Sequence, residues 1–223
     1  MTNKEKTIFY LRDIKNGRVK LSLDILNDKG EKIGILKPII DGKITDNSEI
    51  IRFITKWRKY YQENFLTQFK VTEEGTKNWL ENQVIKQDNK ILFMVETING
   101  KLIGHEGVIF FEEDESACEL DNLARAIDCK IPGIMTYTEK ILIEWLFNHL
   151  NMKKIFLRVF SDNLKTQALH LRCGFFKTKE IGLKREIRKD FFRYVEISEV
   201  DDRPPDKILY VMELKKENFV KIK

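Results

Sequence analysis

The chain has 223 residues, of which 42% are apolar and 34% charged, and its formal net charge is +5. Such a chain can bury one good hydrophobic core, with room for a small appendage. The charges are mixed along the sequence and do not require a nucleic-acid partner, and no apolar run approaches the roughly 20 residues of a membrane span.

The cysteine and histidine content further limits the classes of protein to which the chain could belong. Cys118, Cys129 and Cys173 are odd in number and lack zinc-type spacing, which is typical of a reducing compartment. Only three histidines are present, so we expect neither a zinc hydrolase nor a bound metal. The opening "MTNKEKTIFY" has no signal-peptide core, and we expect a cytoplasmic protein without membrane contact.

The N-terminal part of the sequence predicts strands. Segments 8–14, 19–26 and 32–40 have strand-like composition, and residues 28–30 suit a short hairpin loop. We expect residues 1–33 to form a strand and hairpin extension, residues 34–214 the main domain, and residues 215–223 a tail.

Two helices are expected next. The first runs from Asp46 to about Asn64, and Asp46 with Glu49 forms a capping-box-like start. The second begins at Thr72. The apolar face of the first helix consists of Ile50, Ile51, Ile54 and Trp57.

The centre of the chain predicts three consecutive strands and a helix. The strands lie at 90–97, 101–113 and 116–124, with a hairpin turn at "NG" between the first two. The helix follows Gly133. Its apolar side holds Ile141, Leu142, Trp145 and Leu146, and its polar side holds Glu139, Lys140, Glu144 and Asn148.

The last part predicts a buried strand at 153–160, a helix at 164–173 that Gly174 ends, and strands at 191–197 and 207–214. Because strand 153–160 follows a helical crossover from strand 116–124, the two should be parallel neighbours. The order of elements predicts an α/β fold with a mixed central sheet flanked by helices. A ligand crevice is expected at the carboxyl edge of the parallel strands.

The start of the helix after Gly133 has two interpretations. A glycine lets the backbone approach a ligand closely, and the N–H groups of the first turn lack partners inside the helix, so such an end attracts phosphate. A plain turn into a helix is the simpler interpretation, because one glycine at a helix entrance is weak support.

Two segments read together resemble the GNAT superfamily of acyl-CoA-dependent N-acetyltransferases. One is Lys130-x-x-Gly133-x-Met135 at a strand-to-helix junction, and the other runs from Asn163 through Ala168-Leu169-His170 to Gly174-Phe175. The likeness covers about residues 34–214. It departs from the family pattern where Lys130 replaces Gln or Arg and Met135 replaces a small residue, so Met135 either alters the diphosphate contact or points into the core.

The resemblance implies acetyl-CoA as cosubstrate. The backbone N–H groups of a phosphate-binding loop do not need particular side chains, so the departures leave that role intact. The residues expected around acetyl-CoA are Asn122, Leu123, Ala124, Arg125, Lys130, Ile131, Pro132, Gly133, Ile134, Met135, Thr136 and Asn163. A backbone N–H near Leu123 or Ala124 would stabilise the tetrahedral oxyanion.

Proton transfer has several candidates. Glu119 and Asp121 share a strand face, and either could take the proton of the amine. The resemblance places His170 where the family often has a tyrosine that protonates the leaving thiolate. Structural roles also remain open, with the two carboxylates as solvated residues or salt-bridge partners and His170 as an exposed helix residue.

Three further residues are weaker candidates for a catalytic role. His105 and Glu106 are second candidates for the base, or ordinary residues of the sheet. Cys118 is expected to be a small buried side chain.

The segment "ITKWRKYYQENFLTQFKVTEEGTKNWL" resembles two branches of the superfamily, the ribosomal-protein N-terminal acetyltransferases and bacterial amino-sugar acetyltransferases. We favour a nucleotide-linked amino sugar of surface-glycan biosynthesis as acceptor, contacted by Arg58, His105, Arg185 and Arg188. The alternatives are a protein N-terminus, a small amine such as an antibiotic, or a non-catalytic acyl-CoA-binding module. A homodimer is compatible with the sequence.

Overall fold

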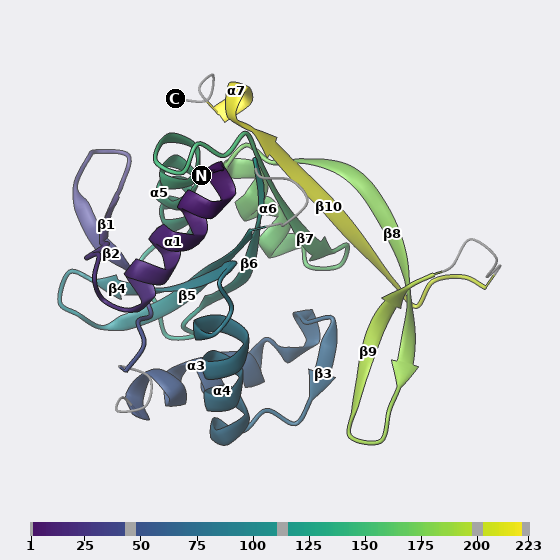
Figure 1. The fold of residues 1–223 in the computed structure, drawn as a ribbon. Coiled ribbons are helices and arrows are strands. Elements are labelled where there is room, and N and C mark those ends of the chain that lie inside the picture. The colour runs from purple at the N-terminus through teal and green to yellow at the C-terminus, as the bar shows by residue number, and fades with distance from the viewer. Residues whose placement is uncertain (1, 43–47, 111–115, 198–202, 220–223) are drawn as a thin grey trace.

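The computed structural model describes residues 2–42, 48–110, 116–197 and 203–219. In these residues one sheet of ten strands dominates the architecture (Figure 1). The order across the sheet is β1 (Leu23–Leu26), β2 (Lys32–Pro38), β4 (Lys90–Thr97), β5 (Leu102–Phe110), β6 (Ala117–Arg125), β7 (Lys154–Phe160), β10 (Lys207–Lys215), β8 (Phe176–Ile187), β9 (Phe191–Glu196) and β3 (Thr67–Phe69).

Helices pack against the sheet. The helices are α1 (Asn3–Lys15), α3 (Ser48–Tyr60), α4 (Glu73–Leu80), α5 (Ile134–Asn148), α6 (Leu164–Arg172) and α7 (Lys216–Phe219), with a 3-10 turn η1 (Gln62–Asn64) and a π turn η2 (Glu81–Ile85). Figure 1 shows α3 and α4 together below β5 and β6, while α5 lies against β1 and β2. This arrangement confirms the mixed sheet flanked by helices.

The core lies between these helices and the central strands. Its largest fully buried side chains include Trp57 of α3, Phe93 of β4 and Phe147 of α5. Each such side chain stabilises the fold by roughly 1.5–3 kcal/mol relative to exposure. A second, smaller core consists of Phe160, Leu183 and Leu209, which come from the neighbouring strands β7, β8 and β10. Strands β8 and β9 form the long arm at the right of Figure 1.

The first predicted strand, residues 8–14, is wrong, because these residues belong to α1. Thr2 and Glu5 form a capping box at its start, and the buried residues Thr7, Leu11 and Ile14 recur at helical spacing. The next two predicted strands are confirmed as the β1–β2 hairpin, in which Gly30 has a φ of 76°. Because β2 also pairs with β4, the hairpin is part of the main sheet, and the division at residue 33 stays a prediction.

Both predicted helices of the following region are confirmed, with a shorter first one. Helix α3 ends at Tyr60, and Ile51, Ile54 and Trp57 are buried on one face as expected. The expected cap at Asp46 lies outside the described residues. Thr72 caps α4, and its hydroxyl accepts a hydrogen bond from the N–H of Gly75 at 3.0 Å.

The sequence interpretation missed two strands, β8 and β3. Residues 176–180 at the start of β8 are all exposed, so apolar and polar residues do not alternate there. Strand β3 is only three residues long and pairs with β9 over Thr67, Gln68 and Phe69. Among the helices of the described residues, none is long and apolar enough to span a membrane.

The parallel pair of β6 and β7 is the feature that positions the site. It is confirmed, but only three residue pairs are in register, from Ala117↔Lys154 to Glu119↔Phe156. A bulge in β6 follows, where Asn122 has a φ of 54° and the register against β5 shifts. A bulge bends a strand and increases its twist, and the two parallel strands diverge from this point.

Candidate active site

A cleft of about 1470 Å³ opens where β6 and β7 diverge. One end is bordered by the N-terminal turns of α5 and α6. The other end is bordered by the segment that joins α3 to β3, together with Trp79 of α4. Gly133 and Asn163, which are expected around acetyl-CoA, lie at the first end, and Arg58, an expected acceptor contact, lies at the second.

Gly133 begins the first end of the cleft. It adopts a left-handed conformation with a φ of 69°, and no side chain caps the helix that follows. The N–H of Tyr137 donates to the carbonyl of Gly133, so the N–H groups of residues 134–136 have no helical partner. These three residues line the cleft, which suits an anionic group such as a diphosphate.

Met135 points into the core. Its side chain is 4% exposed, and its sulfur lies 3.0 Å from the position that a Cβ on Gly104 would occupy. A bulky residue therefore fits on the core side of α5, because Gly104 leaves room for it. Lys130, Ile131 and Pro132 precede the cleft and do not line it, and Lys130 and Pro132 are exposed.

The bulge of β6 forms the middle of the cleft. Leu123, Ala124 and Arg125 line it, and the hydroxyl of Tyr61 donates to the carbonyl of Arg125 at 2.9 Å. Nδ1 of His105 lies 2.5 Å from the carbonyl oxygen of Asn122, beneath the strand. The bulge is therefore held from both sides.

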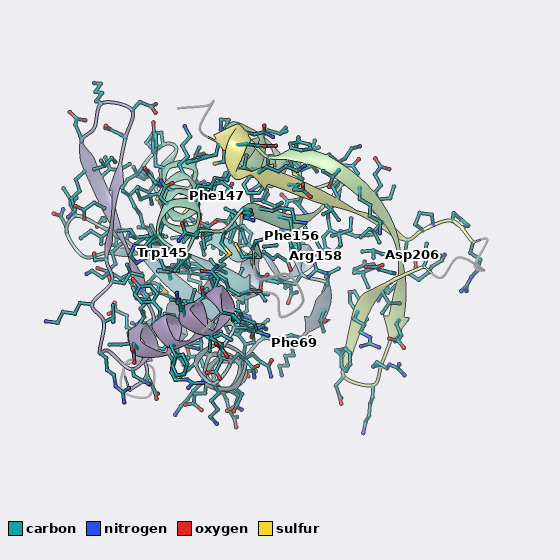
Figure 2. All side chains as sticks on the ribbon, turned by 45° about the horizontal axis from the view of Figure 1, so that its top comes forward. Phe69, Trp145, Phe147, Phe156, Arg158 and Asp206 are labelled. Atoms are coloured by element: carbon teal, nitrogen blue, oxygen red, sulfur yellow. The ribbon has the colours of Figure 1, made fainter. Side chains whose placement is uncertain are left out.

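Glu119 is a salt-bridge partner. Nε and Nη2 of Arg158 donate to its two carboxylate oxygens at 2.7 and 3.1 Å, and Glu119 is 4% exposed. Burial raises the pKa of Glu119, while the guanidinium of Arg158 opposes that rise. Figure 2 labels Arg158 near the middle of the molecule.

Asp121, two residues further along β6, has no such partner. It is half-buried and lines the cleft, and Nδ2 of Asn122 donates to its Oδ2. Burial raises the pKa of Asp121, although Lys90, Arg158 and Arg58 attract its negative charge. No cation of the described chain forms an ion pair with it.

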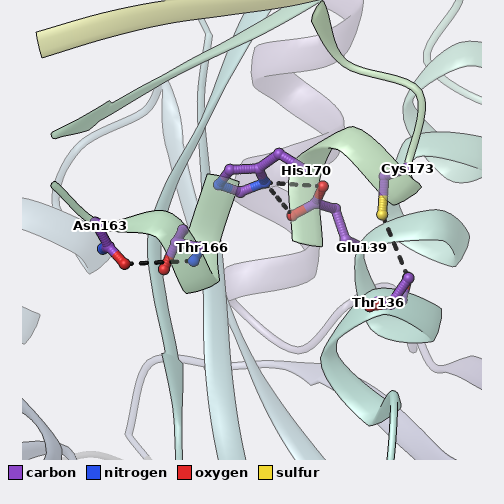
Figure 3. A network of polar contacts seen from close by, with 6 residues as sticks. All are labelled: Thr136, Glu139, Asn163, Thr166, His170 and Cys173. Atoms are coloured by element: carbon purple, nitrogen blue, oxygen red, sulfur yellow. Dashed lines mark hydrogen bonds and ion pairs between the residues drawn. The ribbon is translucent and has the colours of Figure 1, made fainter. Parts of the chain in front are cut away.

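His170 forms a buried pair with Glu139. Nδ1 of His170 lies 2.8 Å from Oε2 and 3.0 Å from Oε1 of Glu139 (Figure 3). The prediction that Glu139 lies on the polar side of its helix is wrong, because the residue is fully buried against α6. Asn163 lines the cleft and caps α6, accepting a hydrogen bond from the N–H of Thr166 at 3.3 Å.

Glu106 and His105 are neighbours on β5, and of the two only Glu106 lines the cleft. Glu106 is fully buried, and neither of its carboxyl oxygens has a hydrogen-bond partner among the described residues. Burial raises its pKa well above the ordinary value, and repulsion from Glu139 adds to this rise. His105 is 1% exposed, packs on Trp57, and does not line the cleft. Burial lowers the pKa of His105 to about 4.

The expected acceptor contacts separate into two groups. Arg58 lines the cleft, with its guanidinium carbon 4.2 Å from the ring centre of Trp79, and burial lowers its pKa to about 10. Arg185 and Arg188 do not line the cleft. Arg185 stacks on Phe192 in the outer arm, and Arg188 pairs with Glu186.

Two remaining expectations concern cysteine and metal. Cys118 is fully buried, and burial raises the pKa of its thiol. Within the described ranges, no group of three or more His, Cys, Asp and Glu side chains could hold a metal ion.

Comparison with known proteins identifies the family. Residues 43–176, more than half of the chain, match the family profile described as "Acetyltransferase (GNAT) domain", so the chain belongs to the GNAT acetyltransferases. No curated protein sequence matches the chain.

Solved structures share the fold. Spermidine N-acetyltransferase from Vibrio cholerae, in complex with CoA and spermine, aligns with a TM-score of 0.62 and 15% identity, over 83% of this chain and 96% of that chain. The spermidine/spermine N-acetyltransferase SpeG from Vibrio cholerae, in complex with manganese ions, aligns with a TM-score of 0.58 and 17% identity, over 85% and 96% of the two chains.

The chain is thus an acetyl-CoA-dependent N-acetyltransferase. The structure adds two residues that the sequence interpretation did not assign to the site, Arg158 and Glu139. Arg158 interrupts the apolar run "KKIFLRVF" at a position that faces the strand of Glu119, which was a usable signal. Glu139 lies between Thr138 and Lys140 in the sequence, but Leu142 and Ile143, three and four residues further on, are buried on the same side of the helix, and they were a usable signal that Glu139 is buried.

Proposed function

We propose that the chain transfers an acetyl group from acetyl-CoA to the primary amine of a small molecule bound at the acceptor end of the cleft. The observation that carries this proposal is Asp121, a half-buried carboxylate that lines the cleft without an ion-pair partner in the described chain. A carboxylate whose pKa is raised is better matched to take a proton from an ammonium near neutral pH.

The acceptor is a small amine and not the nucleotide-linked amino sugar that the sequence favoured. The similar solved structures are spermidine N-acetyltransferases, which supports the alternative of a small amine. In addition, Arg185 and Arg188, two of the four expected sugar contacts, lie outside the cleft. The amino-sugar acceptor therefore has no support in this molecule.

The charges around Asp121 favour an amine with few positive charges. Lys90, Arg158 and Arg58 all act on its carboxylate, and Glu119 is already paired with Arg158. A long polycation would meet these cations on entering the acceptor end. A small monoamine avoids that repulsion.

The reaction needs three proton transfers, two from the amine nitrogen and one to the leaving sulfur, and no covalent enzyme intermediate. Asp121 takes one proton from the ammonium, and the amine nitrogen then attacks the thioester carbon to form a tetrahedral oxyanion. A backbone N–H at the bulge, near Leu123 or Ala124, stabilises this oxyanion. The nitrogen of the intermediate loses its second proton to solvent as the carbon–sulfur bond breaks. This gives the amide and a CoA thiolate, and the thiolate takes a proton from His170.

The test measures release of the CoA thiol with a panel of amines that includes a monoamine, spermidine and a nucleotide-linked amino sugar. Asp121→Asn should lower kcat about 10²–10⁴-fold at pH 7, with little change in the KM for acetyl-CoA. The loss should shrink at pH 9–10, where the amine loses its proton to solvent.

Glu119→Gln is the matched control on the same strand. We expect it to reduce stability through the loss of the Arg158 ion pair, with an effect on kcat that does not vary with pH. An Asp121→Asn loss of equal size at every pH would give Asp121 a structural role. If no amine releases CoA from acetyl-CoA, the proposed function itself fails.

A further inference from the structure

The pair of Glu139 and His170 has a geometry that the proposed reaction does not by itself explain. Of the chain's three histidines, all within the described ranges, only His170 lines the cleft. Its ring is 4% exposed, and Figure 3 shows the nitrogen opposite Nδ1 pointing away from Glu139. Glu139 has no exposed surface and reaches Nδ1 with both oxygens.

This hydrogen bond determines which nitrogen carries a proton. A carboxylate only accepts hydrogen bonds, so the proton between His170 and Glu139 resides on Nδ1. A neutral imidazole in that tautomer has a bare Nε2 and cannot donate a proton into the cleft. His170 can therefore act as an acid only as an imidazolium.

We propose that Glu139 is a positioning residue that holds His170 as an imidazolium with its Nε2–H directed into the cleft, where it protonates the departing CoA thiolate. The proposal deepens the proposed function and rests on it. In the step, the carbon–sulfur bond breaks, the sulfur keeps the electron pair, and the Nε2 proton moves to the sulfur. Neutral His170 remains hydrogen-bonded to Glu139 and regains a proton from water.

The surroundings of the pair support a single negative charge at Glu139. The other ionisable groups that act in this cluster are Glu106 of β5, Cys173 directly after α6, and Lys140 of α5. Glu106 has no cationic partner in the described chain and is fully buried, which favours its protonated form. Burial likewise keeps the thiol of Cys173 protonated, so Glu139 is the anion available to His170.

The test compares Glu139→Gln with wild type over pH 6–9. Gln keeps the size of Glu139 and an oxygen that can accept from Nδ1, but it removes the charge. We expect kcat to fall about tenfold at pH 8, with the alkaline fall of the pH profile displaced to lower pH and an unchanged KM for acetyl-CoA. His170→Phe should lower kcat about ten- to a hundredfold.

Making the same change in a His170→Tyr protein distinguishes a positioning role of Glu139 from a structural one. His170→Tyr supplies a phenol that does not need a neighbouring carboxylate to carry its proton, so it should retain much of the activity. Adding Glu139→Gln to His170→Tyr should then change kcat less than twofold. An equal loss in the histidine and tyrosine backgrounds would give Glu139 a structural role and overturn the proposal.

A direct readout does not depend on turnover or on the variants folding. The ¹⁵N chemical shifts of the wild-type imidazole at pH 7 should show both nitrogens of His170 protonated. A bare Nε2 at that pH would overturn the proposal even if the enzyme is active. Wild-type protein that turns over no amine, yet shows both nitrogens protonated, would contradict only the proposed function.

Discussion

Gly133 offers the sharpest test of how the cleft holds acetyl-CoA. The residue has a φ of 69°, and a Cβ added there would lie 3.1 Å from Cε2 of Tyr137. Gly133→Asp adds a carboxylate beside the free N–H groups of the first turn of α5. Gly133→Asn is the matched control, because it has the same shape, tolerates a positive φ equally and carries no charge.

The expected magnitudes follow from strain and charge. Both variants share a backbone cost of about 1–2 kcal/mol, which for a chain of this size lowers Tm by about 2–8 °C. Binding at 100 times Kd stabilises the wild type by about 2.7 kcal/mol, or roughly 5–11 °C. A carboxylate about 4 Å from one diphosphate charge costs about 1–4 kcal/mol, so Gly133→Asp should bind acetyl-CoA roughly five- to a thousandfold more weakly.

Thermal unfolding with increasing acetyl-CoA measures this difference. Gly133→Asn should keep most of the ligand-induced rise in Tm, and Gly133→Asp should lose most of it. S-acetyl-pantetheine, which has the thioester but no diphosphate, should affect the two variants equally. Equal shifts with acetyl-CoA for Asp and Asn would refute the assignment of the diphosphate to this loop.

Two further predictions concern buried groups and pH. Burial raises the pKa of Glu106, so the native state keeps a proton that the unfolded chain releases above pH ~4.3, and the free energy of unfolding should fall as pH rises from there. Urea unfolding of Glu106→Gln should lack this fall, and an unchanged slope would mean that Glu106 ionises freely. Burial lowers the pKa of His105 to about 4, so the unfolded chain binds a proton at this residue at a higher pH than the native state does. The free energy of unfolding should therefore fall by up to about 3 kcal/mol as the pH falls from 6.5 toward 4. His105→Gln should remove this fall in stability between pH 6.5 and 4. If the urea midpoint of the variant still falls as much as that of the wild type, other groups cause the fall.

Most of the fold could be predicted from the sequence because its elements carry local signals. The "NG" turn, the hydroxyl of Thr72 and the short apolar run of strand β4 each specify their own conformation. Strand β8 has no such signal, since its first residues are exposed and its position is set by pairing with β10. Residues 8–14 misled the prediction because a short apolar run with isoleucine and aromatic residues fits either element.

The site could be predicted only in part for a related reason. The backbone loop at Gly133 and the cap at Asn163 follow from local sequence, and the structure places both at the cleft. Which carboxylate is free and which is paired depends on contacts between distant residues, such as Glu119 with Arg158 and Glu139 with His170. No periodicity within one element reports such pairs.

The four acidic residues near the reaction path differ because their partners differ. Glu119 has its charge balanced by Arg158, and Glu106 lies with unpartnered oxygens in a fully buried position that favours its neutral form. Asp121 lines the cleft and has no ion-pair partner in the described chain. Glu139 directs its charge to His170 on the other side. In the proposed mechanism, these different environments allow Asp121 to take a proton from the amine while His170 returns one to the thiolate at the same pH.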